Sequence, residues 1–413
     1  MNVKITGGAY LKGNVVVSGA KNAAIPLLCA SLLAKGKVLF RNVPHISDIY
    51  DLLEIIKKLN CRVVFKGHTL LIDNTNLTYC PLLFEECGKM RGSYYLIGVF
   101  LTLFAKCEII LPGGCKIGHR PIDIHLQAFQ DLGYEYSIDN NVLYIRRVHS
   151  LEKASIYLKN KSVGASLNAI FACLSLEEVA IQNSLIEPEG ADVIQFLNQI
   201  GYEITRNQDS IQYHKTSLEF KFIKHTIIPD RMEAMTYTIL GLLTGHITIK
   251  KVNTEDLALP LKILEDSGFD IHYTATEIQA KKSIGKGFEI KTDIYPGFPT
   301  DLQPLFGVLT IQTEGKSIIT ETVFENRMHI YYDLLDCGVE CYIKDNCAII
   351  EGPNELIKKN YKAYDLRHGA ALVLLALLED KESLISNFDY ILRGYDNILS
   401  KLKALGATIS IAA

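Results

Sequence analysis

Six short apolar segments with helical character recur along this chain. Each opens on a charged or small residue and continues into alanine, leucine, isoleucine and other apolar side chains, which is typical of a buried helix. The segments begin about 70 residues apart, a spacing that predicts six copies of one structural unit. Their first residues are Lys21, Arg91, Val163, Arg231, Asp301 and Arg367.

The order of elements within a unit also repeats. A short strand is expected after each apolar helix, at residues 37–40, 108–111, 179–182, 246–250, 317–320 and 383–386. A second helix follows, and it ends each time on a residue that accepts the left-handed cap conformation: Asn60, Gly133, Gly201, Gly268, Gly338 and Gly406. With a closing strand pair, this predicts an α/β protein of six βαβαββ-like units whose helices pack on sheets. The period leaves open whether the units form one ring or two bodies of three.

Composition and charge narrow the class of protein. Of 413 residues, 48% are hydrophobic, so the chain can bury a sizeable core. The formal net charge of -3 excludes a protein that coats nucleic acid through bulk positive charge. The longest apolar stretch, residues 94–105, is too short for a membrane span and has no signal-peptide flank. We therefore expect a cytoplasmic protein with no membrane or nucleic-acid partner.

Ten cysteines are scattered through the chain without a Cys-x-x-Cys pair or a paired histidine spacing. Nine of them are typical of small buried side chains in a reducing compartment. Cys115 differs because it lies in a glycine-rich segment, residues 112–121, with Lys116, His119 and Arg120 close in sequence. A structural role remains open for Cys115, but an exposed thiol beside cations shifts toward thiolate and can act as an acid or a nucleophile.

Cations stand at equivalent places in the repeat. They open first helices or precede second helices at Lys21, Arg91, Arg120, Arg231, Arg327, Arg367 and Arg393. A helix N-terminus already favours anions, so an added cation there makes a phosphate or carboxylate site. A single arginine of this kind fits a surface ion pair better. The recurrence instead favours a cleft for a small substrate with more than one negative group.

Asp301 places a carboxylate where four other units place a cation. It follows a turn made rigid by Pro296 and Pro299. One interpretation is an ordinary helix N-cap. The other is a general base, because a carboxylate among cations stays ionised at neutral pH and can accept a proton from a hydroxyl.

Several motifs together carry a resemblance to a known family. They are residues 18–24 (SGAKNAA), 89–93 (KMRGS), 111–121 with its cysteine, 162–165 (SVGA), 229–233 (PDRME), 296–303 (PGFPTDLQ), 324–327 (FENR), 365–367 (DLR) and 393–395 (RGY). In this combination the chain resembles the UDP-N-acetylglucosamine 1-carboxyvinyltransferases (the MurA type of enolpyruvyl transferase) over essentially its full length.

The resemblance implies a fold of two inverted α/β barrel domains with three repeats in each. Domain 1 would run from 20 to 228 and carry the Cys115 loop. Domain 2 would combine residues 1–19 and 229–413 and carry Asp301 and Arg393.

The resemblance also implies an activity. The enolpyruvyl group of phosphoenolpyruvate would move to the 3-hydroxyl of UDP-N-acetylglucosamine by addition and elimination, with release of phosphate. This is the first committed step of peptidoglycan synthesis, which serves cell-wall biogenesis, cell shape and cell division. The family is sensitive to fosfomycin when its loop carries cysteine. No cofactor or metal is implied, and the oligomeric state stays open.

Site residues are implied position by position. Cys115, Asp301, Lys21 and Arg393 would be catalytic, with Cys115 as the acid and Asp301 as the base. Phosphoenolpyruvate would be bound by Lys21, Asn22, Arg120 and Arg393. The sugar nucleotide would be bound by Arg91, Arg120, Pro121, Ile122, Asp123, Ile124, Ser162, Val163, Gly164, Asp301 and Val323, with Glu325, Arg327 and Arg367 as further cleft residues.

Departures from the family pattern keep other functions open. Asn160 stands where the family usually has a lysine, and Pro304 where it has a small residue. The alternatives are an enolpyruvyl transferase that uses another acceptor, such as the shikimate-pathway enzyme, and a catalytically silent regulator that binds nucleotide sugar. The cysteine loop argues against the shikimate-pathway enzyme, which lacks it. Retention of Cys115, Asp301, Lys21 and Arg393 together argues against a silent regulator.

Overall fold

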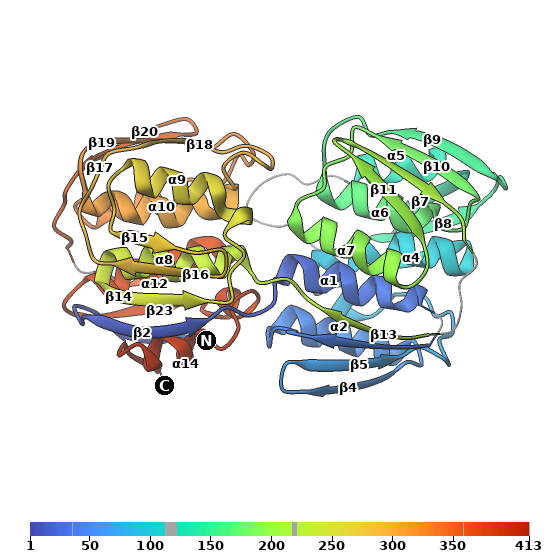
Figure 1. The fold of residues 1–413 in the computed structure, drawn as a ribbon, viewed down its shortest axis with the longest axis horizontal. Helices are drawn as coiled ribbons and strands as arrows, with labels where there is room; N and C mark the ends of the chain where they lie inside the picture. Colours follow the sequence, from blue (N-terminus) through green and yellow to red (C-terminus); the bar gives the residue numbers. More distant parts are fainter. Residues whose placement is uncertain (35, 112–121, 217–220, 358, 413) are drawn as a thin grey trace. The chain divides into compact units, whose positions relative to one another are not determined.

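The computed structural model describes residues 1–34, 36–111, 122–216, 221–357 and 359–412. These residues form two compact units, each with its own hydrophobic core (Figure 1). We call the described part of residues 19–228 the Lys21 unit. We call residues 1–18 together with the described part of 229–412 the Asp301 unit.

The six apolar segments of the sequence form buried helices. In the Lys21 unit they are α1 (Lys21–Ala30), α4 (Tyr95–Phe104) and α6 (Val163–Cys173); in the Asp301 unit they are α8 (Arg231–Thr244), α10 (Gln303–Leu309) and α12 (Leu366–Leu378). Arg91 and Asp301 lie in the 3-10 turns η2 (Arg91–Tyr94) and η4 (Thr300–Leu302), one turn before the α-helix that the sequence predicted to begin there. Each turn therefore places its charged residue ahead of the buried helix.

Amphipathic helices cover the buried ones. They are α2 (Ser47–Lys58), α5 (Asp123–Asp131), α7 (Pro188–Gln199), α9 (Ala258–Asp266), α11 (His329–Asp336) and α14 (Ile398–Ala404). The six predicted cap residues behind them all have positive φ, from 65° at Asn60 to 111° at Gly201. The predicted helix ends are thus confirmed. The remaining short helices are α3 (Glu85–Lys89), α13 (Asp389–Leu392), η1 (Ser31–Leu33), η3 (Glu255–Leu257) and η5 (Thr310–Gln312).

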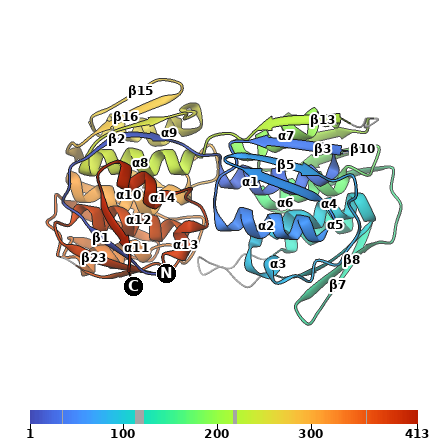
Figure 2. The same ribbon diagram turned by 90° about the horizontal axis from the view of Figure 1, so that it is seen from below.

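In the Lys21 unit the described strands form three sheets. The first has the order β13 (Lys221–Thr226), β3 (Gly36–Arg41), β5 (Thr69–Asp73), β4 (Arg62–Lys66). The second is β6 (Lys106–Ile110), β8 (Val142–Arg147), β7 (Tyr134–Asp139), and the β7–β8 hairpin extends away from the helices (Figure 2). The third is β9 (Lys153–Tyr157), β10 (Glu178–Gln182), β12 (Ser210–His214), β11 (Glu203–Asn207).

In the Asp301 unit the described strands again form three sheets. The first is β2 (Leu11–Val16), β14 (Gly245–Lys250), β16 (Glu277–Lys281), β15 (Ile271–Tyr273). The second pairs β17 (Gly285–Lys286) and β18 (Glu289–Lys291) with β19 (Thr313–Thr320), followed by β21 (Cys347–Gly352) and β20 (Cys341–Lys344). The third is β22 (Tyr361–Lys362), β23 (Glu382–Ser386), β1 (Val3–Thr6), β24 (Thr408–Ile411), which places both ends of the described chain in one sheet.

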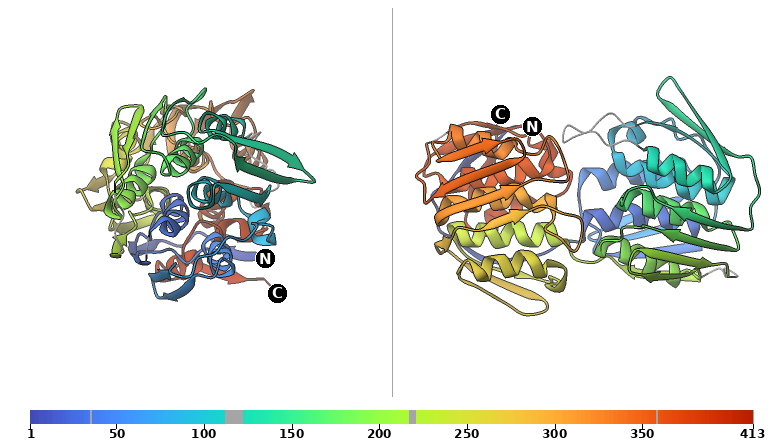
Figure 3. Two further views of the ribbon diagram at one scale, coloured as in Figure 1. Left: turned by 90° about the vertical axis from the view of Figure 1, so that its right-hand side faces the viewer. Right: turned by 90° about the horizontal axis from the view of Figure 1, so that it is seen from above.

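The sheets share one construction. In five of them an edge strand runs parallel to the strand that follows a buried helix, and two antiparallel strands complete the sheet. In the sheet of β6 the parallel contact is a single bridge between Leu82 and Ile109. In each unit the buried helices lie between the sheets (Figure 3). The predicted α/β architecture of repeated βαβαββ-like units is confirmed.

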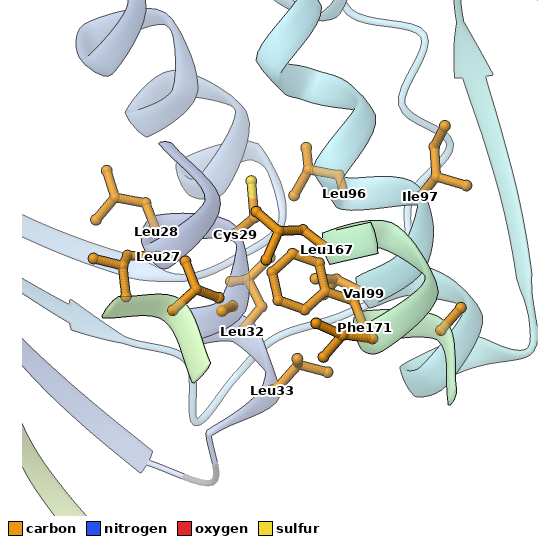
Figure 4. Packing of buried hydrophobic residues seen from close by; sticks show 14 of the residues in the cluster. Leu27, Leu28, Cys29, Leu32, Leu33, Leu96, Ile97, Val99, Leu167 and Phe171 are labelled. Atoms are coloured by element: carbon orange, nitrogen blue, oxygen red, sulfur yellow. The ribbon is translucent and has the colours of Figure 1, made fainter. Parts of the chain in front are cut away.

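Burial of apolar side chains holds the repeats together. Around α1, α4 and α6 the contact is made by residues such as Leu27, Leu96 and Phe171, which are inaccessible to solvent (Figure 4). No helix in the described ranges is both long and apolar enough to cross a membrane.

Two chain segments cross from one unit to the other side by side. The amide of Ala20 donates to the Ile228 carbonyl at 2.8 Å, and that of Asp230 donates to the Ser18 carbonyl at 2.9 Å. A Cβ on Gly19 would lie 1.8 Å from the carbonyl oxygen of Asn42, so this crossing requires glycine.

Candidate active site

Asp301 lies between two buried arginines of the Asp301 unit. Its Oδ1 accepts a hydrogen bond from Arg327 Nη2 at 2.8 Å, and its Oδ2 accepts one from Arg367 Nε at 2.9 Å. Both arginine side chains are 4% exposed, whereas the Asp301 side chain is 26% exposed. The carboxylate is therefore the part of this cluster that a ligand can reach.

The charges of this cluster fix its protonation state. Burial alone would raise the pKa of Asp301, but the charges of Arg367 and Arg327 outweigh it and hold that pKa well below its usual range. Burial alone would lower the pKa of Arg367, and the charge of Asp301 reverses that effect. Asp301 is thus a carboxylate at neutral pH, and each of its oxygens can accept a second hydrogen bond.

Glu321 connects this cluster to the neighbouring loop. Its Oε2 accepts from the hydroxyl of Thr300 at 2.8 Å, and the same hydroxyl accepts from Arg327 Nη1 at 2.8 Å. Its Oε1 accepts from the amides of Val323 at 2.7 Å and Phe324 at 3.0 Å. Glu321 is 1% exposed. It therefore ties the turn that carries Asp301 to the loop that carries Val323, Glu325 and Arg327.

Arg393 and Glu325 are the other predicted residues of the Asp301 unit. Arg393 follows the last residue of α13 and is half-buried, and a Cβ on the next residue, Gly394, would approach the Leu366 side chain at 2.5 Å. The Arg393 segment therefore packs against the start of α12, beside Arg367. Glu325 is exposed.

The start of α1 carries an ion pair in the Lys21 unit. Lys21 Nζ lies 2.7 Å from Asp48 Oδ2, and the two side chains are 13% and 6% exposed. Asp48 belongs to the first turn of α2, so the pair joins the beginnings of two consecutive helices. Asn22 follows Lys21 and is exposed.

His125, on α5, lies where two of the predicted segments of the Lys21 unit pack together, residues 122–124 and 162–164. A Cβ on Gly164 would lie 3.3 Å from its Cε1, so the segment of Ser162, Val163 and Gly164 packs against α5, where Ile122, Asp123 and Ile124 lie. Burial and then the charge of Arg91 lower the pKa of His125 to about 4, which keeps its ring neutral. Arg91 itself lies over the Tyr94 ring, with its Cζ 5.3 Å from the ring centroid.

The nine cysteines in the described ranges are free thiols, six of them buried and three half-buried. Burial raises the pKa of Cys61 and Cys87 to about 12 and of Cys337 and Cys341 to about 11. These thiols stay protonated and poorly nucleophilic at neutral pH. Cys115, Arg120 and Pro121 lie outside the described residues.

The chain is similar over almost its whole length to curated relatives. It is 38% identical over 408 residues to UDP-N-acetylglucosamine 1-carboxyvinyltransferase of Halothermothrix orenii, covering 98% of both chains. It is 37% identical over 412 residues to UDP-N-acetylglucosamine 1-carboxyvinyltransferase 2 of Bacillus subtilis, covering 98% of this chain and 96% of the relative. The chain belongs to the UDP-N-acetylglucosamine 1-carboxyvinyltransferase family. It is therefore a transferase.

Wider comparisons agree with this family of carboxyvinyltransferases. The family model described as EPSP synthase (3-phosphoshikimate 1-carboxyvinyltransferase) matches residues 5–402. The fold is also that of the enolpyruvyl transferase NikO from Streptomyces tendae, with a TM-score of 0.91 at 22% identity over 99% of this chain and 98% of that one. EPSP synthase from Acinetobacter baumannii has a TM-score of 0.77 at 16% identity over the full length of both chains. The predicted enolpyruvyl transferase fold is thus confirmed.

Three buried residues that contact candidate site residues or their segments escaped the sequence analysis: Asp48 and His125 in the Lys21 unit, and Glu321 in the Asp301 unit. Asp48 pairs with Lys21 and His125 packs against Gly164, whereas Glu321 accepts from Val323 and from Thr300, the neighbour of Asp301. His125 could have been predicted from the sequence, because it stands two residues after Asp123 in the same expected helix. In the described ranges no group of three or more His, Cys, Asp or Glu side chains has the arrangement of a metal site.

Proposed function

We propose that this enzyme transfers the enolpyruvyl group of phosphoenolpyruvate to the 3-hydroxyl of UDP-N-acetylglucosamine and releases phosphate. Its partners are then these two small molecules, and its role is the first committed step of peptidoglycan synthesis in the cytoplasm, which supports cell shape and division. The observation that carries the proposal is Asp301, an ionised, quarter-exposed carboxylate fixed by two buried arginines in a chain with carboxyvinyltransferase relatives. The division into two units also supports domains at 20–228 and at 1–19 with 229–413.

In the addition step, the vinyl carbon of phosphoenolpyruvate takes a proton and the neighbouring carbon bonds to the sugar oxygen. We assign the acid to Cys115 and the base to Asp301. As the new bond forms, the hydroxyl oxygen gains positive charge and its proton becomes strongly acidic. A carboxylate of low pKa is then a sufficient acceptor, and the two arginines keep Asp301 ionised at neutral pH to receive it. Loss of a proton from the methyl carbon of the resulting ketal and cleavage of its bond to phosphate then restore the double bond.

The cations of the site fit the charges that this reaction presents. We assign phosphoenolpyruvate to Lys21, Asn22, Arg120 and Arg393, and the sugar nucleotide to Arg91, residues 120–124, residues 162–164, Asp301 and Val323. Arg327 and Arg367 hold Asp301 in place, and each is fixed by hydrogen bonds before substrate arrives. Preorganised charges of this kind stabilise developing charge without reorganisation during the reaction.

The acceptor is tested by phosphate release from phosphoenolpyruvate with UDP-N-acetylglucosamine, with 3-phosphoshikimate, and with no acceptor. We expect phosphate to be released only in the reaction that contains UDP-N-acetylglucosamine as the acceptor. Release with 3-phosphoshikimate instead would assign the chain to the other carboxyvinyltransferase activity. Binding of the sugar nucleotide without release, measured by calorimetry, would favour the silent regulator.

Asp301→Asn is expected to bind UDP-N-acetylglucosamine and to lose most turnover, since the amide keeps the shape of the carboxylate and cannot accept the proton. General-base catalysis is worth about a hundred- to ten-thousand-fold. The rate of phosphate release and the dissociation constant of the sugar nucleotide are measured for both proteins. Near-normal turnover would remove Asp301 from the role of base.

Cys115 is expected to be the fast-reacting thiol among the ten cysteines, with fosfomycin as the probe. The antibiotic's phosphonate would occupy the phosphate site, and the thiolate would open the epoxide to a thioether while the epoxide oxygen takes up a proton. Burial protects six of the described cysteines and raises the pKa of their thiols, for example to about 12 at Cys61. Intact mass and peptide mapping should locate one adduct at Cys115. The Cys115→Asp variant serves as the control, and an adduct that persists in it would contradict the assignment.

A further inference from the structure

The start of α12 presents Arg367 to Asp301, and this helix has few polar contacts of its own. From Arg367 to Leu377 its residues are buried, and nearly all beyond His368 are apolar. The hydrophobic effect is not directional, so burial alone does not single out one rotation of the first turn. The contact between Arg367 Nε and Asp301 Oδ2, at 2.9 Å, depends on that rotation.

The next residue, His368, supplies a directional contact. Its Nε2 lies 2.7 Å from Asp333 Oδ2 on α11, and its Nδ1 lies 3.3 Å from the amide of Tyr364. Because the amide can only donate, Nδ1 accepts and Nε2 carries the proton that goes to Asp333. The two helices lie next to each other (Figure 2). The side chain of His368 is 3% exposed and that of Asp333 is 23% exposed, so the histidine end of this bond is shielded from water.

Other groups around His368 keep the first turn in register. Asp365 caps the helix, with its Oδ1 accepting from the amides of Arg367 at 2.8 Å and His368 at 3.0 Å. The Tyr364 ring stacks on the His368 ring at 5.4 Å between centroids, and the His329 ring lies 5.9 Å away. The Asp365 cap determines where α12 begins, whereas the bond from His368 to Asp333 determines the rotation of its first turn about the helix axis.

We propose that His368, through its hydrogen bond to Asp333, is a positioning residue that orients Arg367 and so holds the Asp301 carboxylate in its reactive geometry. Consecutive residues on an α-helix point about 100° apart, so a rotation that releases His368 also withdraws Arg367. A hydrogen bond tolerates only a few tenths of an ångström of such movement. The kinetic consequence rests on the proposed function, in which Asp301 accepts the proton of the sugar hydroxyl.

The test compares His368→Ala, His368→Gln and a matched control, Tyr361→Phe. Tyr361 donates to Glu379, the residue that follows the C-terminal end of the same helix, and Glu379 keeps Ser383 as a partner at 2.6 Å. Both side chains are buried, and each truncation removes two polar contacts near one end of α12. His368→Ala removes those with Asp333 and the Tyr364 amide, and Tyr361→Phe removes those with Glu379 and Cys337. Thermal unfolding shows whether the losses of stability are similar.

We expect His368→Ala to lower kcat for phosphate release at least about tenfold with a smaller change in KM, because small misplacements of reacting groups are costly. His368→Gln can still donate to Asp333 and should regain most of the rate. Tyr361→Phe should keep kcat within about twofold, as a change distant from the reacting groups does. Equal losses of kcat in Tyr361→Phe and His368→Ala, or an unchanged kcat in His368→Ala, would overturn the proposal.

A crystal structure of His368→Ala tests the geometry without any assay, and so separates this inference from the proposed function. The Arg367 Nε to Asp301 Oδ2 distance should exceed about 3.5 Å, the limit of a hydrogen bond. If His368→Ala does not fold, the same measurement on His368→Gln should give the unchanged contact and on Asp333→Ala the broken one. A contact that stays at 2.9 Å without the bond to Asp333 would overturn the proposal.

Discussion

The negative charge of Asp301, held between two buried guanidinium groups, is the interaction on which the candidate site of the Asp301 unit depends. Arg327 and Arg367 are almost fully removed from water, and a buried charge without its partner is strongly destabilising. The three residues therefore need one another in the folded protein. Neighbouring side chains hold the segments that carry these three residues. Glu321 bonds to Thr300 and to the loop of Val323, and His368 bonds to Asp333 from the helix of Arg367.

The repeated architecture explains why charged residues gather at helix starts. The buried helices are largely apolar, and their charged side chains lie in the first turn or in the segment before it. There the free amide groups of the helix end favour anions, and a carboxylate such as Asp230 or Asp365 caps the helix. Because charged side chains are confined to these starts, Lys21, Arg91, Arg231 and Arg367 stand at equivalent positions of four repeats. A small polyanionic substrate is the ligand that such an arrangement suits.

Much of the fold could be predicted from local sequence. Apolar runs marked the buried helices, and a glycine or asparagine marked each helix end, because those signals depend on neighbouring residues alone. The 3-10 turns at Arg91 and Asp301 were missed, since a tight turn and the first turn of an α-helix share the same sequence preferences.

The site was predictable only in part. Asp301, Arg327 and Arg367 were named as site residues, but not the bonds that join them. The roles of Asp48, Glu321 and His368 could not be predicted from the sequence, because each acts through a contact with a residue on another element. His368 and Asp333, for instance, are 35 positions apart.

The ionisation of Asp301 tests the central claim most directly. Carbon-13 NMR of protein labelled at aspartate carboxyl groups, with Asp301→Asn to identify the signal, follows its charge as the pH is lowered. The account predicts that the Asp301 signal stays in its carboxylate position from about pH 8 to about pH 3, because Arg327 and Arg367 hold its pKa below the ordinary value of about 3.9. A midpoint at or above that ordinary value would show that the two arginines do not hold the charge, and would contradict the account.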